Sequence, residues 1–346
     1  MAESVLVLQT AFLGDCILSL PFLARLAELE PNREIHIVTA PAGEGVFRRA
    51  LDRGLAGMSH RTRLLLYRKR GEDAGFRGFL ALASRVRRSG QVEKAFCLQR
   101  SARTAALAIA SKARERIGFS SGAASYLYTN SVGRDWNSGR SEIEKNLDLL
   151  RAAYGREVAP WDPRTAPSIL GPDDETPRRS PEAPVLIALG SPWPTKRWPT
   201  RHAKELVVRL LARGQRVKLV GDPSAVPLAA EVRAGITSPL LEDLCGRTSI
   251  ASWLDEIAAA KVVVSGDSAA VHAASDLRTP VVALFGPTLP DFGFAPWRAG
   301  SLALGVSHLE CRPCHIHGPK VCPLGHHRCL EDLGGDHVYK RLLRYL

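Results

Sequence analysis

Short apolar runs alternate along the first half of the chain with longer segments in which apolar residues recur every three or four positions. The runs are predicted strands, at 4–9, 34–39 and 94–99. The longer segments are predicted helices, at 14–29, 78–89 and 101–112. Because this alternation is typical of a parallel sheet covered by helices, we predict an α/β fold for the first half.

A second series of the same kind follows a break rich in proline, glycine and charge, TAPSILGPDDETPRRSPEAP at 165–184. Its predicted strands are 185–189, 217–220, 261–265 and 281–285. Its predicted helices are 200–213, 249–260 and 269–276, and the last residues, DHVYKRLLRYL, form a short amphipathic helix.

The predicted organisation is two Rossmann-like, doubly wound domains. We divide the chain into an N-terminal domain, a linker, a C-terminal domain and a C-terminal helix, at 1–165, 166–184, 185–334 and 335–346. Two such halves hold a ligand between them, at the carboxyl ends of their strands. The function should therefore be found in the loops that follow strands.

Composition narrows the class of protein. The 346 residues, 45% of them apolar, are enough for two cores, and no stretch approaches the roughly 18 to 20 apolar residues of a membrane span. The start lacks the basic region of a signal peptide, and the seven cysteines are an odd number. We therefore expect a cytoplasmic protein without a disulfide scaffold.

Positive charge is concentrated in the first half. The net charge is +12, and residues 1–170 hold 26 basic and 17 acidic residues. The basic residues are densest in RTRLLLYRKR at 61–70. This run is either a solvated surface or an attraction for an anionic partner, such as nucleic acid, phospholipid headgroups or an acidic glycolipid. The chain has only six tyrosines and no alternation of aromatic and basic residues, which disfavours nucleic acid.

The loop after the first strand, QTAFLGDCILSLP at 9–21, carries an acid at the start of a predicted helix. It has a single glycine and does not match a dinucleotide-binding GxGxxG pattern. Asp15 either caps the helix or, facing the site from a strand end, acts as a general base. The residues of this loop alone leave both roles open.

Two segments of the second half suit an anionic ligand. GSPWPTKRWP at 190–199 places Lys196 between a strand and a helix, where it is suited to phosphate unless it belongs to a solvated turn. VVVSGDSAAVHAAS at 262–275 runs from a buried strand through Asp267 into a helix whose first N–H groups can hold a diphosphate. Taken alone, His272 in that helix is more typical of a packed core histidine than of a ligand-binding residue.

Four cysteines near the C-terminus have the spacing C-x2-C-x7-C-x6-C, with histidines nearby. They are Cys311, Cys314, Cys322 and Cys329. This spacing is compatible with bound zinc, with reduced structural thiols or with a disulfide, and the sequence leaves the three open.

Taken in order, several motifs resemble those of the bacterial ADP-heptose:lipopolysaccharide heptosyltransferases, glycosyltransferase family 9, and are most similar to the heptosyltransferase II group. They are LGDCILSLP, RGEDAGFRGF, KRWP, GRTSI, SGDSAAVHAAS, PVVALFGPT and CPLGHHRCL, which together cover nearly the whole chain. The resemblance implies a GT-B fold, with the acceptor on the first domain and the nucleotide sugar on the second. It also implies heptose transfer from an ADP-linked donor to the inner lipopolysaccharide core, with inversion and with no cofactor or metal.

The resemblance also implies roles for individual residues. Asp15 matches the general base, and the donor-binding positions are Ser191, Lys196, Thr248, Asp267, Ser268, Ala269 and His272. The basic residues Arg68, Lys69 and Arg70 are expected on the acceptor side, where they would attract an anionic core at the inner face of the inner membrane. Ala269 stands where the family usually has glycine, which bears on how closely the backbone approaches the phosphates.

Three alternatives stay open. The first is a family 9 enzyme with another donor or acceptor. The second is a nucleotide-sugar-binding protein without turnover, although the presence of both Asp15 and Lys196 argues against it. The third is a basic nucleic-acid-binding module, which would bind in a steeply salt-dependent manner and which we do not expect.

Overall fold

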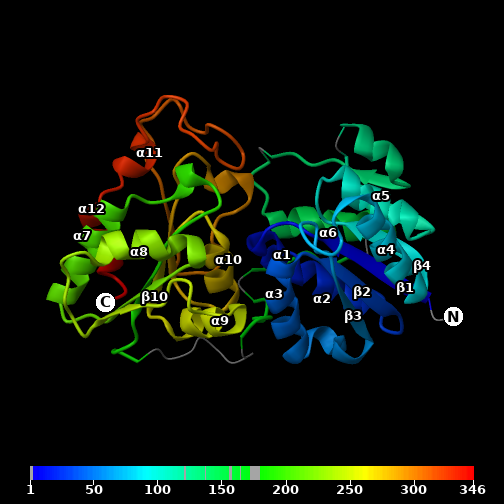
Figure 1. Cartoon of the computed structure of the whole chain (residues 1–346), viewed down its shortest axis with the longest axis horizontal. Helices are drawn as coiled ribbons and strands as arrows, with labels where there is room; N and C mark the ends of the chain where they lie inside the picture. Colours follow the sequence, from blue (N-terminus) through cyan, green and yellow to red (C-terminus); the bar gives the residue numbers. More distant parts are fainter. Residues whose placement is uncertain (1–2, 121, 137, 156–157, 164, 172–179) are drawn as a thin grey trace. The chain divides into compact units, whose positions relative to one another are not determined.

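The computed structural model describes residues 3–120, 122–136, 138–155, 158–163, 165–171 and 180–346, and it divides into two compact units (Figure 1). The first unit comprises Met1–Asp135 and Glu142–Asp162. The second comprises Trp136–Ser141 and Pro163–Leu346. Part of the predicted linker, 172–179, lies outside the described residues.

The first unit is built on six parallel strands in the order β3-β2-β1-β4-β5-β6. The strands are β1 (Glu3–Gln9), β2 (Glu34–Thr39), β3 (Thr62–Leu66), β4 (Gln91–Cys97), β5 (Glu115–Phe119) and β6 (Asn130–Val132). The helices are α1 (Leu13–Leu18), α2 (Leu20–Leu29), α3 (Pro41–Asp52), α4 (Gly75–Arg88), α5 (Ala102–Ala110) and α6 (Glu142–Tyr154), with 3₁₀ turns at Leu55–Gly57, Ser59–Arg61 and Gly122–Leu127. The predicted α/β fold of this half is confirmed.

The second unit repeats this plan, with six parallel strands in the order β12-β11-β10-β7-β8-β9. The strands are β7 (Val185–Ala188), β8 (Val217–Val220), β9 (Leu241–Asp243), β10 (Val262–Gly266), β11 (Val281–Leu284) and β12 (Leu302–Leu304). The helices are α7 (Thr200–Ala212), α8 (Val226–Arg233), α9 (Ile250–Ala259), α10 (Ala269–Asp276), α11 (Arg328–Glu331) and α12 (Gly335–Leu342), with 3₁₀ turns at Pro194–Lys196, Pro223–Ala225 and Pro290–Phe292.

The two sheets have the same topology, which fixes where each unit can bind a ligand. Numbered within its own unit, each strand order reads 3-2-1-4-5-6, the doubly wound order. The order reverses between β1 and β4 in the first sheet and between β7 and β10 in the second. Loops at the carboxyl ends of these strand pairs diverge to opposite faces and leave room for a ligand.

The central strands are buried on both faces. Val5, Leu6, Val7 and Leu8 of β1 all have zero exposure. A strand covered by helices on both sides has no polar face, which is why β1 and β7, its counterpart in the second sheet, contain continuous apolar runs rather than alternating ones.

The predicted helix at 14–29 is divided into α1 and α2 at Ser19. Ser19 ends α1 and also begins α2, and Pro21 follows it. Proline has no N–H to donate to the carbonyl four residues earlier, so an uninterrupted helix would lose a hydrogen bond here. The Ser19 hydroxyl instead donates to the Cys16 carbonyl at 2.7 Å.

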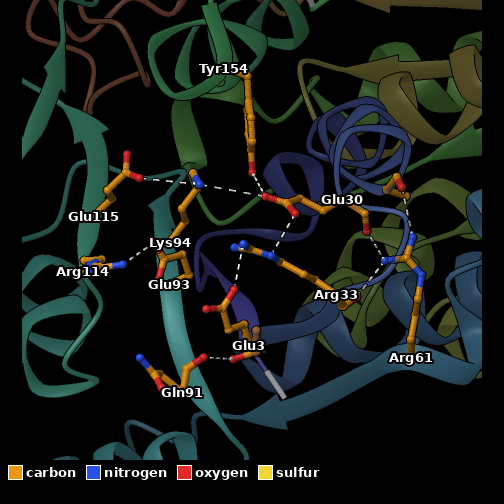
Figure 2. A network of polar contacts seen from close by, with 12 residues as sticks. Glu3, Glu30, Arg33, Arg61, Gln91, Glu93, Lys94, Arg114, Glu115 and Tyr154 are labelled. Atoms are coloured by element: carbon orange, nitrogen blue, oxygen red, sulfur yellow. Dashed lines mark hydrogen bonds and ion pairs between the residues drawn. The ribbon is translucent and has the colours of Figure 1, made fainter. Parts of the chain in front are cut away.

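The basic run at 61–70 contains β3, the edge strand of the first sheet that pairs with β2. Its charged residues interrupt the apolar pattern, so this strand was not predicted. Arg61, at its start, has a structural role. Its NH1 donates to the carbonyls of Glu30 at 2.6 Å and Arg33 at 2.8 Å, and its NH2 donates to that of Ala27 at 3.0 Å (Figure 2). The guanidinium therefore binds carbonyls in the last turn of α2 and in the turn that follows it.

Glu30 also belongs to a polar network at the amino-terminal ends of the strands of the first sheet (Figure 2). Its carboxylate accepts the Tyr154 hydroxyl at 2.7 Å and pairs with Arg33 at 3.2 Å. Lys94 of β4 lies 4.0 Å from Glu30 and 3.5 Å from Glu115 of β5. The network thus joins α2, α6 and two strands at the edge of the sheet opposite to the loops that carry Asp15.

We expect Arg61→Ala to lower the free energy of unfolding by about 1 to 3 kcal/mol, because three partly buried carbonyls lose a charged donor. Arg63→Ala is the matched control: its side chain is 55% exposed and its contact with Glu34 is 3.4 Å long, so about 0 to 1 kcal/mol should be lost. Urea unfolding followed by circular dichroism measures both. Equal losses in the two variants would contradict the structural role of Arg61.

Candidate active site

Asp15 is positioned by the loop after β1 and by the first turn of α1. It is the third residue of α1 and is half-buried. The Gln9 side chain closes the loop, because its Nε2 donates to the Asp15 carbonyl at 3.3 Å and its Oε1 accepts the Ala11 N–H at 3.3 Å. Since Phe12 occupies the N-cap position, Asp15 is a first-turn acid that the helix dipole favours, whatever chemistry its carboxylate performs.

Loops from three strands meet at Thr10. Lys69 Nζ, from the loop after β3, donates to the Thr10 carbonyl at 3.1 Å. Gln99, which follows β4, donates through Nε2 to Thr10 Oγ1 at 2.8 Å. Burial, reinforced by the nearby Arg103 charge, lowers the pKa of Lys69. Lys69 therefore lies beside the loop that carries Asp15, although the two are 54 residues apart in the sequence.

Arg68 and Arg70 lie in the same loop. The Arg68 guanidinium is 3.6 Å from Glu72, and Arg70 is exposed. Asp73 fixes the loop, because its carboxylate accepts the Arg68 backbone N–H at 2.7 Å and Arg85 NH2 at 2.5 Å. The basic segment thus has a defined backbone rather than being a loose charged surface.

The turn after β7 carries Ser191 and Lys196. Gly190 has a φ of 85°, which favours glycine, and Ser191 Oγ accepts the Trp193 N–H at 3.1 Å. Arg197 Nε donates to the Ser191 carbonyl at 2.9 Å. These contacts close a compact turn, from which Lys196 reaches the carboxyl end of the neighbouring strand β10.

The second sheet brings Lys196, Asp267 and Thr288 together. Lys196 Nζ lies 2.6 Å from Asp267 Oδ2, and Thr288 Oγ1 donates to the same oxygen at 2.8 Å. The side chains of Lys196 and Asp267 are only 10% and 6% exposed. A Cβ on Gly266 would lie 2.7 Å from the Lys196 carbonyl, so only glycine lets the two loops approach this closely. The cluster joins the loops of β7, β10 and β11, three neighbouring strands.

Sequence reasoning assigned no role to Thr288 or to Arg312, which supports it. Arg312 donates to the carbonyl of Thr288 at 3.1 Å, to that of Phe285 at 2.9 Å, to that of Gly286 at 2.5 Å and to that of Val306. One guanidinium therefore joins the start of the loop after β11 to Val306, which follows β12. The available signal was the position of Thr288 just after a predicted strand, since neighbouring parallel strands end at the same edge.

The start of α10 carries the other residues expected around the ligand. Ser268 is the N-cap, and its Oγ accepts the Ala270 N–H at 3.3 Å, so Ala269 is the first helical residue. His272, one turn further on, is 3% exposed, and its ring stacks on Trp297 with centroids 5.9 Å apart. Among the described residues no group hydrogen-bonds its Nδ1.

Burial lowers the pKa of His272 to about 4, although the Asp267 charge opposes the shift and Lys196 reinforces it. The imidazole is therefore neutral at physiological pH. It packs against aromatic rings as a core residue would, yet its unpaired nitrogen is compatible with a contact to a bound ligand.

Thr248 follows β9, the edge strand of the second sheet that lies two strands away from β7. Gly246, with a φ of 70°, donates its N–H to the Gly221 carbonyl at 2.9 Å and so joins the ends of β9 and β8. Within the part of the chain that the structure describes, no hydrogen bond links Thr248 to the Lys196 cluster. The two face the same edge from different strands.

The cysteine cluster contains free thiols. Among the described residues no group of three or more histidine, cysteine or acidic side chains has an arrangement that could hold a metal ion. Burial alone would raise the pKa of Cys322, but the backbone N–H groups of residues 324–327 lower it overall. The structure thus contains no zinc-binding arrangement and no disulfide in the residues it describes.

No helix in the described ranges combines the length and apolar content that crossing a bilayer requires. The fold of the whole chain is that of two-domain GT-B proteins. The structure of E. coli ADP-heptose lipopolysaccharide heptosyltransferase II superposes with a TM-score of 0.74 at 21% identity, covering 99% of this chain and 98% of that one. The glycosyltransferase family 9 structure from Veillonella parvula does so with a TM-score of 0.79 at 19% identity, covering 99% and 97%.

The family model described as glycosyltransferase family 9 (heptosyltransferase) matches residues 80–322, and the chain belongs to this family. Lipooligosaccharide heptosyltransferase 2 of Haemophilus influenzae is 35% identical over 102 residues, 29% of this chain and 30% of the relative. Lipopolysaccharide heptosyltransferase 2 of Salmonella typhimurium is 37% identical over 102 residues, 29% of each. The chain thus matches less than a third of the length of these relatives.

His272 makes the stability of the second unit sensitive to acid. Its pKa is about 4 when folded and about 6.5 when unfolded, so the unfolded chain binds the extra proton between these values and stability falls as pH falls. From pH 7 to pH 5 we expect a loss of about 2 kcal/mol from this group. Urea unfolding of wild type and His272→Gln at both pH values measures it.

The His272→Gln variant should show a smaller decrease, whatever its stability at pH 7. His337→Gln, which changes an exposed histidine of α12, is the control and should keep the wild-type pH dependence. The same decrease in wild type and His272→Gln would contradict the assignment.

Proposed function

We propose that this chain transfers heptose from ADP-heptose to the inner core of lipopolysaccharide, as a heptosyltransferase II-like enzyme. Membership of family 9 and the names of its relatives support the reaction class. The observation that carries the proposal is the Lys196–Asp267–Thr288 cluster, which lies at the reversal of strand order in the second sheet. A polar cluster at that position suits a nucleotide diphosphate.

On the donor side, Lys196 would supply positive charge to the diphosphate. The first N–H groups of α10, after Ser268 and at Ala269, would bind the phosphate oxygens. Ser191 shapes the turn that presents Lys196, and Thr248, in the loop after β9, would meet the nucleoside end of the donor. His272, neutral and buried, would contact the donor without adding charge.

Asp267 has two roles in this proposal. Its Oδ2 accepts from both Lys196 and Thr288, which orients the ammonium group. Within the described part of the chain no donor binds Oδ1, so this oxygen can accept a hydroxyl of the sugar. A carboxylate so close to the phosphates is tolerable because Lys196 balances its charge.

Asp15 would act as the general base. The acceptor hydroxyl loses its proton to the Asp15 carboxylate while its oxygen forms a bond to the anomeric carbon. The bond from that carbon to the β-phosphate oxygen breaks, and its electron pair leaves with ADP. Attack on the face opposite to the leaving group inverts the configuration. Lys196 and the α10 N-terminus would stabilise the charge that develops on ADP.

Arg68, Lys69 and Arg70 would attract the anionic core on the acceptor side. The contact between Lys69 and the Thr10 carbonyl supports this assignment, because it brings the basic loop next to the loop of Asp15. Attraction of this kind acts mainly on encounter and weakens as salt rises.

We expect Asp15→Asn to lower kcat for heptose transfer by about 10²- to 10⁴-fold, because it keeps the shape of the side chain and removes the base. The Kd for ADP-heptose should change by no more than a few fold, since the base acts in the reaction step. Steady-state assays with a truncated core acceptor and calorimetry with the donor measure the two effects. Asp52→Asn, an exposed acid at the end of α3, is the control. A variant that keeps more than about a tenth of the wild-type kcat would reduce Asp15 to a helix-terminal acid.

Lys196→Ala should weaken donor binding and also lower kcat, with kcat/KM for the donor falling by about 10²- to 10³-fold, because phosphate charge is present in the bound donor and grows in the transition state. Wild-type donor Kd and kcat would remove Lys196 from the site. Thr288→Val separates orientation from charge, since it keeps Lys196 and removes one hydrogen bond to Asp267. Thr288→Val should lower kcat/KM for the donor by about tenfold, and Thr288→Ser, which keeps the hydroxyl, should retain the wild-type value.

A further inference from the structure

The outer face of α4 exposes large apolar side chains. Phe76 is 74% exposed and Leu80 is 43% exposed, and the two are one helical turn apart. The inner face of the same helix is buried in the first unit through Leu82, Ala83 and Val86. Because the helix is already packed on one side, its exposed apolar residues are a feature of the finished fold and not of an unpacked helix.

The same outer face is basic. Arg77 lies beside Phe76, and Arg88 follows it three turns along the helix. No acidic residue occurs in α4. Among the residues that the structure describes, neither Arg77 nor Arg88 forms an ion pair or a hydrogen bond, whereas Arg87 donates to the Ala110 carbonyl at 2.8 Å.

The start of this face lies next to the loop that carries the basic residues 68–70. A Cβ on Gly78 would lie 2.2 Å from the Asp73 backbone, so α4 packs directly on the loop that carries Arg68, Lys69 and Arg70. Lys69 in turn contacts Thr10, in the loop where Phe12 is 57% exposed. The exposed apolar residues at the start of α4 therefore stand at the carboxyl edge of the first sheet, the edge that also carries Asp15.

We propose that the outer face of α4, formed by Phe76, Arg77, Leu80, Ala81 and Arg88, docks on the surface of an anionic phospholipid bilayer. Phe76 and Leu80 enter the boundary between headgroups and acyl chains, and Arg77 and Arg88 pair with headgroup phosphates. The inference rests on the proposed function in one respect: an acceptor anchored in a lipid has to reach Asp15 from a membrane.

Charge complementarity favours a bilayer over a second copy of the chain. A symmetric dimer would place the same face on both sides of the contact, and Arg77 and Arg88 of one copy would lie near those of the other. Such like charges repel, whereas an anionic surface attracts all of them. Isolated exposed apolar residues are common, but here two of them share a helix face with unpaired cations.

The test is co-sedimentation of the full-length protein with vesicles of phosphatidylethanolamine and phosphatidylglycerol, and with neutral phosphatidylcholine vesicles. Wild type should bind the anionic vesicles and bind less at 1 M salt. Phe76→Ser with Leu80→Ser should lower the partition coefficient by about ten- to hundredfold. Arg77→Gln with Arg88→Gln should lower it by about tenfold or more and flatten its salt dependence.

The control pair is Val208→Ser with Leu343→Ser, which changes residues of the second unit that are 48% and 43% exposed and should bind as wild type. A soluble, deacylated acceptor separates this inference from the proposed function. The Phe76/Leu80 variant should keep wild-type kcat on it and lose rate only on acceptor embedded in vesicles.

Absence of wild-type binding to anionic vesicles, or equal binding by wild type and both α4 variants, overturns the proposal. So does a dimer in solution that the Phe76/Leu80 variant converts to monomer without any change in vesicle binding, since the face would then be an interface between copies. If wild type binds anionic vesicles and the α4 variants do not, but wild type transfers no heptose, the docking face is upheld and the proposed reaction is refuted.

Discussion

The buried carboxylate of Asp267 is the constraint on which the second unit's site depends. A carboxylate whose side chain is only 6% exposed needs hydrogen-bond donors and a positive charge within the protein, because little water reaches it. Lys196 and Thr288 meet both needs at one oxygen, and they come from the loops of two other strands. A buried ion pair recovers little of its desolvation cost, so its value lies in fixing three loops in one arrangement. Arg312 extends that arrangement by holding the Thr288 loop through its carbonyls.

The alternation of apolar runs and amphipathic segments predicted the strands and helices around the two central strands, because burial on both faces leaves an unmistakable pattern. It missed the edge strands, among which β3 contains Arg63 and lies next to only one other strand, and it also missed β5, which lies between β4 and β6. It also missed the break at Ser19, although the proline two residues later was visible in the sequence. Edge strands tolerate charge and helices tolerate a proline in the first turn, so neither signal depends on hydrophobic periodicity.

The site residues also divide into those that the sequence pattern predicts and those that it does not. Lys196 and Asp267 could be named from the sequence because each follows a predicted strand, and the sheet then brings the two together. Thr288 also follows a strand, but a lone threonine has no distinguishing pattern, and Arg312 acts through carbonyls that only the folded backbone assembles. The basic run at 61–70 shows that residues with the same charge can have different roles in the structure. Its charges look alike in the sequence, yet Arg61 binds the end of α2, Lys69 contacts Thr10 and Arg70 is exposed.

In the first unit, the two ends of the strands differ in how their charged residues are paired. Its polar network around Arg61 and Glu30 lies at the amino-terminal edge of the sheet, where charges are paired with one another and with helix ends. At the carboxyl edge the basic loop is fixed by Asp73 instead, and it leaves Arg70 and the start of α4 open to solvent. Pairing satisfies the charges that hold the fold, whereas water hydrates the exposed cations and leaves the exposed apolar side chains without a packing partner. The two ends of the strands therefore differ: the charges at the amino-terminal end are paired with one another, whereas the end that carries Asp15 leaves basic and apolar residues exposed.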